Sequence, residues 1–270
     1  MSGSSHVFII VSPRPRTGKT LLARLVAEYY QSNARAIGQT EARPIVGYDL
    51  SPYEPGLSAF LPSITTQSTL EDTRGQIALF DQLVLDDDKT KVVDLSHMVL
   101  EKFFTLAYDI GFAEEAAARG MSAVVMYIAD HSPIAVDTYR ILRERFPALT
   151  FMPVFNDAIV RGPDIRRQFQ PSAGAPVPLQ IPQLSSTLRV QVDRRPFSFR
   201  EFRATPPTFT PEHQREEMAN FLKRVFRQLR EAELANLMFK LTSSLGPFGH
   251  LPPLPSRTAD AGADKEMLVD

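Results

Sequence analysis

Apolar residues along the chain follow two alternating spacings, one typical of buried strands and one typical of amphipathic helices. Short apolar runs rich in β-branched residues fit strands that are buried on both faces of a sheet. Between these runs, apolar residues recur at every third or fourth position, as on one side of a helix. The alternation predicts an α/β fold, a doubly wound and mostly parallel sheet. The expected strands are 7–11, 44–50, 91–94, 122–128, 150–155 and 177–182, and the expected helices include 20–31, 100–110 and 132–146.

A further helix is predicted to be capped by Ser68 or Thr69 and to continue to Leu83. The last helix is expected at about 210–243, with a first apolar stripe that packs on the core. A second stripe on the same helix fits the core or a partner helix better than a membrane surface, because its flank is not strongly basic. We therefore expect one domain over residues 1–245 and a disordered tail over 246–270, which is rich in Pro, Ala, Asp and Gly. The second stripe consists of Leu234, Leu237, Met238, Leu241 and Leu245.

Composition narrows the class of protein. The 270 residues are 43% hydrophobic, which is enough to build a core. The chain has no cysteine, which excludes disulfides, thiolate metal sites and cysteine nucleophiles. No apolar run has the length of a membrane span and no signal peptide is recognisable, so we expect a cytoplasmic protein.

The net charge of −1 argues against a dedicated nucleic-acid protein, but the charges are unevenly distributed. Residues 161–203 contain eight arginines and three acidic residues. Residues 192–200 interleave arginines with Phe197 and Phe199 and are expected to be extended. Such a stretch could bind a nucleic-acid backbone and stack on its bases. The alternative, which the pattern favours, is that both phenylalanines pack inward and the arginines stay in water.

The strand at 7–11 and the helix at 20–31 enclose a candidate phosphate-binding loop. Gly18-Lys19-Thr20 supplies the last part of the pattern G-x-x-x-x-G-K-[ST], in which backbone amides at a helix N-terminus bind phosphate oxygens. Lys19 would then reach the β- and γ-phosphates, and the Thr20 hydroxyl would bind Mg²⁺. The first glycine of the pattern is replaced by Pro13, and Pro15 follows, so neither position has an amide to donate. The remaining donors of this narrower site are the amides of Arg16, Thr17, Gly18, Lys19, Thr20 and Leu21.

Two of the predicted strands end in an acidic residue. Asp49 closes the strand at 44–50, and Asp94 closes the strand at 91–94. Ligands of open parallel sheets lie at the carboxyl ends of the strands, so both carboxylates should lie beside the loop. Asp94 is typical of the acidic residue that holds Mg²⁺ directly or through water in phosphoryl-transfer proteins. The expected metal site therefore comprises Thr20, Asp49 and Asp94.

These motifs resemble those of the ParA/MinD group of deviant-Walker P-loop ATPases. The segment 14–20, Arg-Pro-Arg-Thr-Gly-Lys-Thr, is similar to the family signature Lys-Gly-Gly-x-Gly-Lys-Thr. The leading lysine of that signature reaches the phosphates of the partner in a nucleotide-sandwich dimer, and Arg14 stands in its place. The resemblance thus implies ATP, Mg²⁺ and an ATP-dependent homodimer, with Lys19, Asp49 and Arg14 in catalytic roles.

The same resemblance extends to the later segments. Residues 49–61 look like the family's switch segment, in which the second aspartate positions the attacking water. One alignment puts Ser51 at that place and implies very slow hydrolysis, whereas another puts Asp49 there and preserves it. Asn156 and Pro182 stand where the family contacts the adenine base.

The function that the sequence favours is an ATP-binding, slowly hydrolysing molecular switch. It would dimerise around Mg·ATP to position or recruit a partner. That partner would be a protein or non-specific DNA bound through the arginine-rich segment 161–203, with a membrane as the less favoured choice. Two alternatives stay open. One is a small-molecule kinase or ligase, with Asp130 and His131 as candidate acceptor-site residues, and the other is an interaction protein that has lost hydrolysis.

Overall fold

The computed structural model describes residues 5–33, 44–162, 164–172 and 177–244. Their strands form one seven-stranded sheet of order β3-β2-β4-β1-β5-β6-β7, in which every neighbouring pair is parallel. An α/β fold with a parallel sheet is therefore confirmed. The strands are β1 (His6–Val11), β2 (Ile45–Leu50), β3 (Thr65–Gln67), β4 (Thr90–Leu95), β5 (Ser122–Ile128), β6 (Thr150–Asn156) and β7 (Leu179–Ile181).

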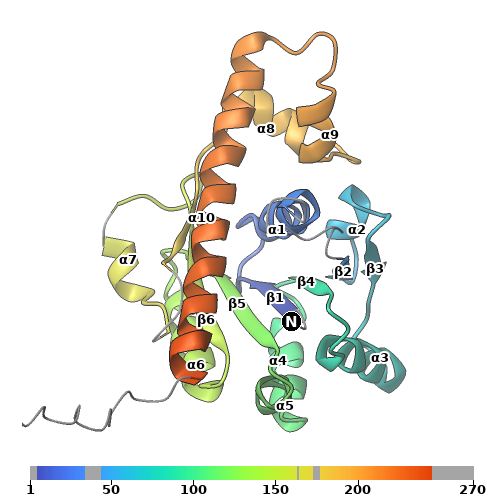
Figure 1. Cartoon of the computed structure of the whole chain (residues 1–270), viewed down its shortest axis with the longest axis vertical. Helices are drawn as coiled ribbons and strands as arrows, with labels where there is room; N and C mark the ends of the chain where they lie inside the picture. Colours follow the sequence, from blue (N-terminus) through green and yellow to red (C-terminus); the bar gives the residue numbers. More distant parts are fainter. Residues whose placement is uncertain (1–4, 34–43, 163, 173–176, 245–270) are drawn as a thin grey trace, which may run out of the picture.

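Helices cover both faces of the sheet (Figure 1). Helices α3 to α6 pack on one face, while α1, α2 and α8 to α10 pack on the other. The long helix α10 contacts β7, α1 and α9. The helices are α1 (Lys19–Asn33), α2 (Leu57–Phe60), α3 (Thr73–Val84), α4 (Leu100–Asp109), α5 (Phe112–Ala118), α6 (Pro133–Arg145), α7 (Asp164–Gln168), α8 (Ser186–Val192), α9 (Phe199–Ala204) and α10 (Glu212–Ser244).

The order of the strands reverses at β1 and β4, because the strand that follows β1 lies on one side of this pair and the strand that follows β4 lies on the other. The connection after β1 runs over one face towards β2, and the connection after β4 runs over the other face towards β5. In open parallel sheets such a switch point leaves a crevice at the carboxyl ends of the two strands. The loop after β1 and the carboxylate of Asp94 near the end of β4 both lie at this point.

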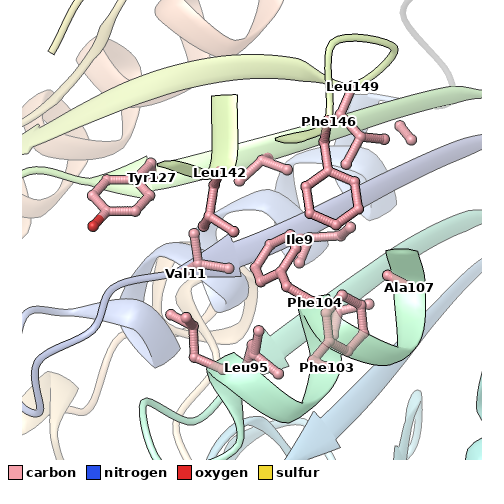
Figure 2. Close-up of a cluster of buried hydrophobic side chains, with 14 of the residues drawn as sticks. Ile9, Val11, Leu95, Phe103, Phe104, Ala107, Tyr127, Leu142, Phe146 and Leu149 are labelled. Carbon is pink, nitrogen blue, oxygen red and sulfur yellow. The ribbon is translucent and has the colours of Figure 1, made fainter. Parts of the chain in front are cut away.

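Alternating residues of β1 supply the two halves of the core, as the period of a strand requires. Ile9 and Val11 face the α4 side, whereas Phe8 and Ile10 face the α1 side. Figure 2 shows Ile9 and Val11 directed towards the aromatic rings of α4. Each layer of helices is therefore held to the sheet by apolar contacts on its own face.

Two local expectations were wrong. Helix α3 is capped by Asp72, whose carboxylate accepts a 2.8 Å hydrogen bond from the Gly75 amide, and neither Ser68 nor Thr69 caps it. Residues 192–200 are not extended, because α8 ends at Val192 and α9 begins at Phe199. The Ser198 hydroxyl caps α9 by accepting the Glu201 amide, and the buried carboxylate of the distant Glu28 accepts the amides of Phe199 and Arg200.

The other expectation for this segment is confirmed, since Phe199 is buried and Phe197 packs against the same core cluster. On α10, the first apolar stripe is buried as predicted, including Phe221 and Val225. Leu234 and Met238 of the second stripe are exposed. The side chains of Leu237 and Leu241, together with Leu245 and the predicted tail 246–270, lie outside the described residues.

Candidate functional site

The loop between β1 and α1 is folded by two residues with positive φ. Arg16 has φ of 57° and Gly18 has φ of 97°. Alternation of left-handed and right-handed residues turns successive amides towards one side, which is the geometry of an anion-binding nest. A Cβ atom at Gly18 would lie 2.7 Å from Asn156 Nδ2. Glycine is therefore required there both by the backbone angle and by the close approach of β6.

Lys19 begins α1 and points into the loop. Its Nζ donates a 2.7 Å hydrogen bond to the carbonyl oxygen of Arg14. The side chain is buried, and burial lowers the pKa of Lys19 to about 8, although the charge of Asp94 opposes this shift. An ammonium group with a poorly solvated charge is thus available inside the loop, where an anion would stabilise it.

Thr20 and Asp94 meet at the switch point. The Thr20 hydroxyl donates a 2.7 Å hydrogen bond to Asp94 Oδ2, and the Leu57 amide donates to the same oxygen at 3.1 Å. Asp94 is buried, and burial raises its pKa to about 6, although the Thr20 hydroxyl counteracts this rise. A buried carboxylate with so few neutralising partners is typical of a functional site.

Asp49 lies beside Asp94, because the two residues are paired in the register of β2 and β4. Its Oδ2 accepts hydrogen bonds from the Gly56 amide at 2.8 Å, the Ser58 amide at 2.9 Å and the Ser58 hydroxyl at 2.6 Å. Its Oδ1 accepts from the Ser51 amide at 3.1 Å. Asp49 is thus fully buried and organises the loop that follows β2.

Asn156 and Thr17 join β6 to the loop. Asn156 Nδ2 donates a 3.0 Å hydrogen bond to the Thr17 carbonyl. The Thr17 hydroxyl is buried and has no hydrogen-bond partner among the described residues. Pro182 follows β7, and Ile181 of that strand accepts a 3.0 Å hydrogen bond from the Asp157 amide. The side chain of Asn156 therefore supports the loop, and its expected contact with a base stays a prediction, as does that of Pro182.

Arg14 reaches away from the loop to the end of β5. Its Nη1 lies 3.2 Å from Asp130 Oδ1, and half of the side chain is exposed. Burial disfavours the charged form of Asp130, but the Ser132 amide and the Arg14 guanidinium hold its pKa below the usual range. Asp130 is therefore an ionised ion-pair partner, which makes it a poor acceptor-site base.

The eight arginines of residues 161–203 are all exposed, but they differ in their contacts. Arg161 donates to Gln183 at 2.6 Å, Arg166 donates to Gln180 at 3.0 Å, and Arg189 pairs with Asp193 at 3.9 Å. Arg167 of α7 is exposed, and so is a group of four arginines in and just before α9. This group consists of Arg194, Arg195, Arg200 and Arg203.

Three features of the site were missed from the sequence. The amides of Gly56 and Leu57 contact the strand-end acids, although their own side chains carry no chemistry. His97, three residues after Asp94, has a pKa lowered by burial and by the charge of Lys19, so it lies within electrostatic reach of the loop. Its position just after β4, at the carboxyl end of a central strand, could have predicted that it lies near the loop. Arg24 is buried and lies over the rings of Phe60 and Phe199.

Comparison with models of known protein families finds no match to this sequence, and comparison with curated proteins finds none either. Among the described residues, no group of three or more His, Cys, Asp or Glu side chains could hold a metal ion. No helix among them is both long and apolar enough to cross a membrane. The donor set of Thr20 and Asp94 is the kind used for Mg²⁺, which commonly takes one or two protein oxygens and completes its shell with phosphates and water.

Proposed function

We propose that this protein is a P-loop nucleotide-binding switch of the ParA/MinD type, which binds Mg·ATP and dimerises around it. The observation that carries the proposal is the meeting of Thr20 with Asp94 beneath a loop that encloses the Lys19 ammonium. A hydroxyl, a carboxylate and an ammonium at a helix N-terminus form a set that fits the phosphates and the cation of a nucleotide.

The phosphate side of the fit rests on three groups. The positive φ angles of Arg16 and Gly18 shape an amide nest despite the prolines at 13 and 15. The buried Thr17 hydroxyl lacks a partner among the described residues, and a phosphate oxygen would give it one. Lys19 would exchange the Arg14 carbonyl for a phosphate oxygen, which is the better acceptor for a buried ammonium.

The cation side of the fit rests on Thr20 and Asp94, with Asp49 next to them. Mg²⁺, when bound, would neutralise charge on the phosphates. Asp94 would hold it through the oxygen that already faces the Thr20 hydroxyl. Asp49 is engaged by the loop after β2, so its metal-binding and catalytic roles require that loop to rearrange.

A group of exposed apolar side chains supports a dimer. Tyr53, Met98, Ile134 and Ile159 follow the carboxyl ends of β2, β4, β5 and β6, and all four are exposed. In a parallel sheet the carboxyl ends of the strands lie at one end of the sheet, so the four residues belong to the same end of the molecule as the candidate site. A second copy of the chain on this end would bury them and would bring its Arg14 to the neighbouring phosphates.

We expect hydrolysis to be slow in either alignment with the family's switch segment. If Asp49 is the residue that positions water, its carboxylate is already occupied by hydrogen bonds. If Ser51 stands at that place, no carboxylate is present there. Non-specific DNA is the nucleic-acid partner that the exposed arginines of α9 would suit, since phosphate contacts need no base recognition. We place the protein in the cytoplasm, where ATP is abundant and where a chain without cysteine needs no oxidising environment.

The alternative is an interaction protein without hydrolysis. It is favoured by the four hydrogen bonds that occupy Asp49 and by the prolines in the loop. The kinase alternative loses one of its two candidate acceptor-site residues, because Asp130 is paired with Arg14.

The test is titration with a fluorescent ATP analogue with and without Mg²⁺, followed by light scattering to measure the mass of the protein. ATP binding with a shift from monomer to dimer supports the switch. Lys19→Ala should abolish both, while Lys89→Ala, a lysine paired with Asp87 away from the loop, should leave both unchanged. Binding without dimerisation or hydrolysis would favour the interaction protein, and the absence of binding would overturn the nucleotide site.

A further inference from the structure

Residues 56–58 are clamped between the two strand-end acids. Asp49 accepts the Gly56 amide, the Ser58 amide and the Ser58 hydroxyl, and Asp94 accepts the Leu57 amide that lies between them. Three consecutive amides are therefore bound by two adjacent carboxylates. Asp49 also holds the start of the loop through the Ser51 amide.

Gly56 fits this clamp because it has no side chain. A Cβ atom there would lie 2.7 Å from Asp94 Oδ2, 2.9 Å from Ser51 Oγ and 3.2 Å from Asp49 Oδ1. The backbone of the loop thus occupies the space between the carboxylates themselves. Between the anchored ends of the loop, residues 52–55 are exposed, and the Tyr53 side chain is 79% exposed.

The amide of Leu57 and the hydroxyl of Thr20 converge on one oxygen, Asp94 Oδ2. A cation held directly by both the Thr20 oxygen and Asp94 would take the place beside this oxygen, where the Leu57 amide donates. An amide hydrogen carries positive partial charge, so it cannot stay on the lone pair that a divalent cation takes. Direct binding would therefore displace the Leu57 amide, and it would disturb the hydrogen bonds that the neighbouring Gly56 and Ser58 amides make to Asp49.

We propose that residues 51–58 form a latch that responds to the divalent cation and not to the terminal phosphate. The latch is the set of hydrogen bonds from residues 51 and 56–58 to Asp49 and Asp94, and it opens when Asp94 and Thr20 take a cation directly. This inference rests on the proposed function, because the cation arrives with the nucleotide. Opening frees the Asp49 carboxylate and moves Tyr53, which belongs to the apolar group of the proposed dimer surface.

The latch makes a distinctive prediction about ligands. ATP in the presence of a chelator should leave the latch closed. Mg·ATP and Mg·ADP should both open it, because each delivers the cation. A loop that reads the terminal phosphate would instead distinguish ATP from ADP.

Hydrogen exchange of the full chain, read on peptides that cover residues 51–60, measures the latch directly. We expect exchange to become about tenfold faster or more with Mg·ATP and Mg·ADP, the size expected when a hydrogen bond to a charged group is lost. Unchanged exchange under conditions where fluorescent ATP demonstrably binds with Mg²⁺ would overturn the latch alone. Faster exchange with ATP and chelator would also overturn it. Failure of any nucleotide to bind would remove the proposed function and the latch together.

Two variants and a control sharpen the test. Asp94→Asn keeps an acceptor for the Leu57 amide but loses the charge that attracts a cation, so its latch should stay protected with Mg·ATP. In Gly56→Ala the added Cβ would collide with the Asp94 carboxylate, so residues 51–60 should exchange rapidly without any cation. If Gly56→Ala does not fold, the result with Asp94→Asn still decides the test. Asp157→Asn alters an acid at the end of β6 that is bound to Gln180, and its latch should respond as in the wild type. Opening of the Asp94→Asn latch by Mg·ATP would contradict the proposal.

Discussion

The Thr20 hydroxyl donates a 2.7 Å hydrogen bond to Asp94, although the two residues lie 74 positions apart in the chain. The register explains the contact, because Ile10 of β1 is paired with Asp94 of β4 and the loop after β1 returns over that strand end. The pair is thus fixed by the central strands of the sheet. A cation site built on it would be preformed on one side and closed by residues 56–58 on the other.

The affinity for ATP should fall as the pH rises through about 8. Burial lowers the pKa of Lys19 to about 8, so the free protein loses the ammonium above that pH. Because phosphates prefer the protonated form, binding should be about tenfold weaker at pH 9 than at pH 7. Titration of fluorescent ATP across this range measures the effect. Lys19→Arg, whose guanidinium stays charged, is the control, and if it binds ATP its affinity should not change over this pH range. An affinity of the wild type that does not change with pH would contradict the role of Lys19.

Arg14→Ala should spare ATP binding by the monomer but weaken the ATP-dependent dimer. The Arg14 guanidinium is half exposed and lies at the end of β5, outside the loop that encloses Lys19. Removal of a charge that pairs with phosphate across an interface should weaken the dimer by about 2 kcal/mol or more, roughly thirtyfold. Sedimentation with Mg·ATP gives the dimer constant, and Arg14→Lys should recover part of it. If Arg14→Ala dimerises as the wild type does, the role across the interface is wrong.

Asp94→Asn should stabilise the nucleotide-free protein at neutral pH. Burial raises the pKa of Asp94 from 3.8 to about 6, so the folded state binds a proton more tightly than the unfolded state. This group therefore destabilises the wild type as the pH rises from about 4 to about 6, and the cost stays constant above that range. The gap between 3.8 and about 6 corresponds to at most about 3 kcal/mol.

Urea unfolding of the wild type and Asp94→Asn at pH 4 and pH 7.5 measures this difference. The advantage of the variant should be small at pH 4 and largest at pH 7.5. An equal difference at both values would show that ionisation of Asp94 does not govern it. Asp81→Asn replaces an exposed acid on α3 and should alter the free energy of unfolding by less than about 0.5 kcal/mol.

Arg24→Met should strongly destabilise the fold. Arg24 is buried, donates to the carbonyls of Val192 at 3.0 Å and Phe197 at 3.3 Å, and is the nearby cation for buried Glu28. Arg24 and Glu28 carry opposite charges in the interior, and removal of one such buried charge typically costs about 3–5 kcal/mol. Chemical denaturation gives the value, with Arg227→Met as the exposed control.

The double variant Arg24→Met with Glu28→Gln should be more stable than Arg24→Met alone, because no buried carboxylate is then left without a nearby opposite charge. A loss below about 1 kcal/mol in Arg24→Met would contradict the importance of this contact.

Much of the architecture could be predicted because strong apolar runs determine it. The bounds of the strand at 122–128 were predicted correctly, because all of its residues are buried and its apolar run is continuous from Ala123 to Ile128. β3 was missed because Thr65–Gln67 is short and partly exposed at the edge of the sheet, so no pattern marks it. The cap of α3 was misplaced because Ser68, Thr69 and Asp72 all suit that position, and only tertiary contacts choose among them.

Around the candidate site, side chains were easier to predict than backbone. Lys19, Thr20, Asp49 and Asp94 belong to residue types whose chemistry is visible in a sequence. The amides of residues 56–58 are invisible there, because every residue except proline has one. Arg24 was missed for a different reason, since an arginine on a helix is usually expected in solvent.

Arg24 and Glu28 lie one turn apart on α1, the helix whose first residue is Lys19. Arg24 donates to the Val192 carbonyl at the end of α8, and Glu28 accepts the Phe199 amide at the start of α9. Helix α1 therefore links the loop at its start to α9 and its exposed arginines. If a ligand at the loop shifts α1, the exposed arginines of α9 would shift with it. The affinity for a partner bound to these arginines would then depend on a ligand that the partner does not contact.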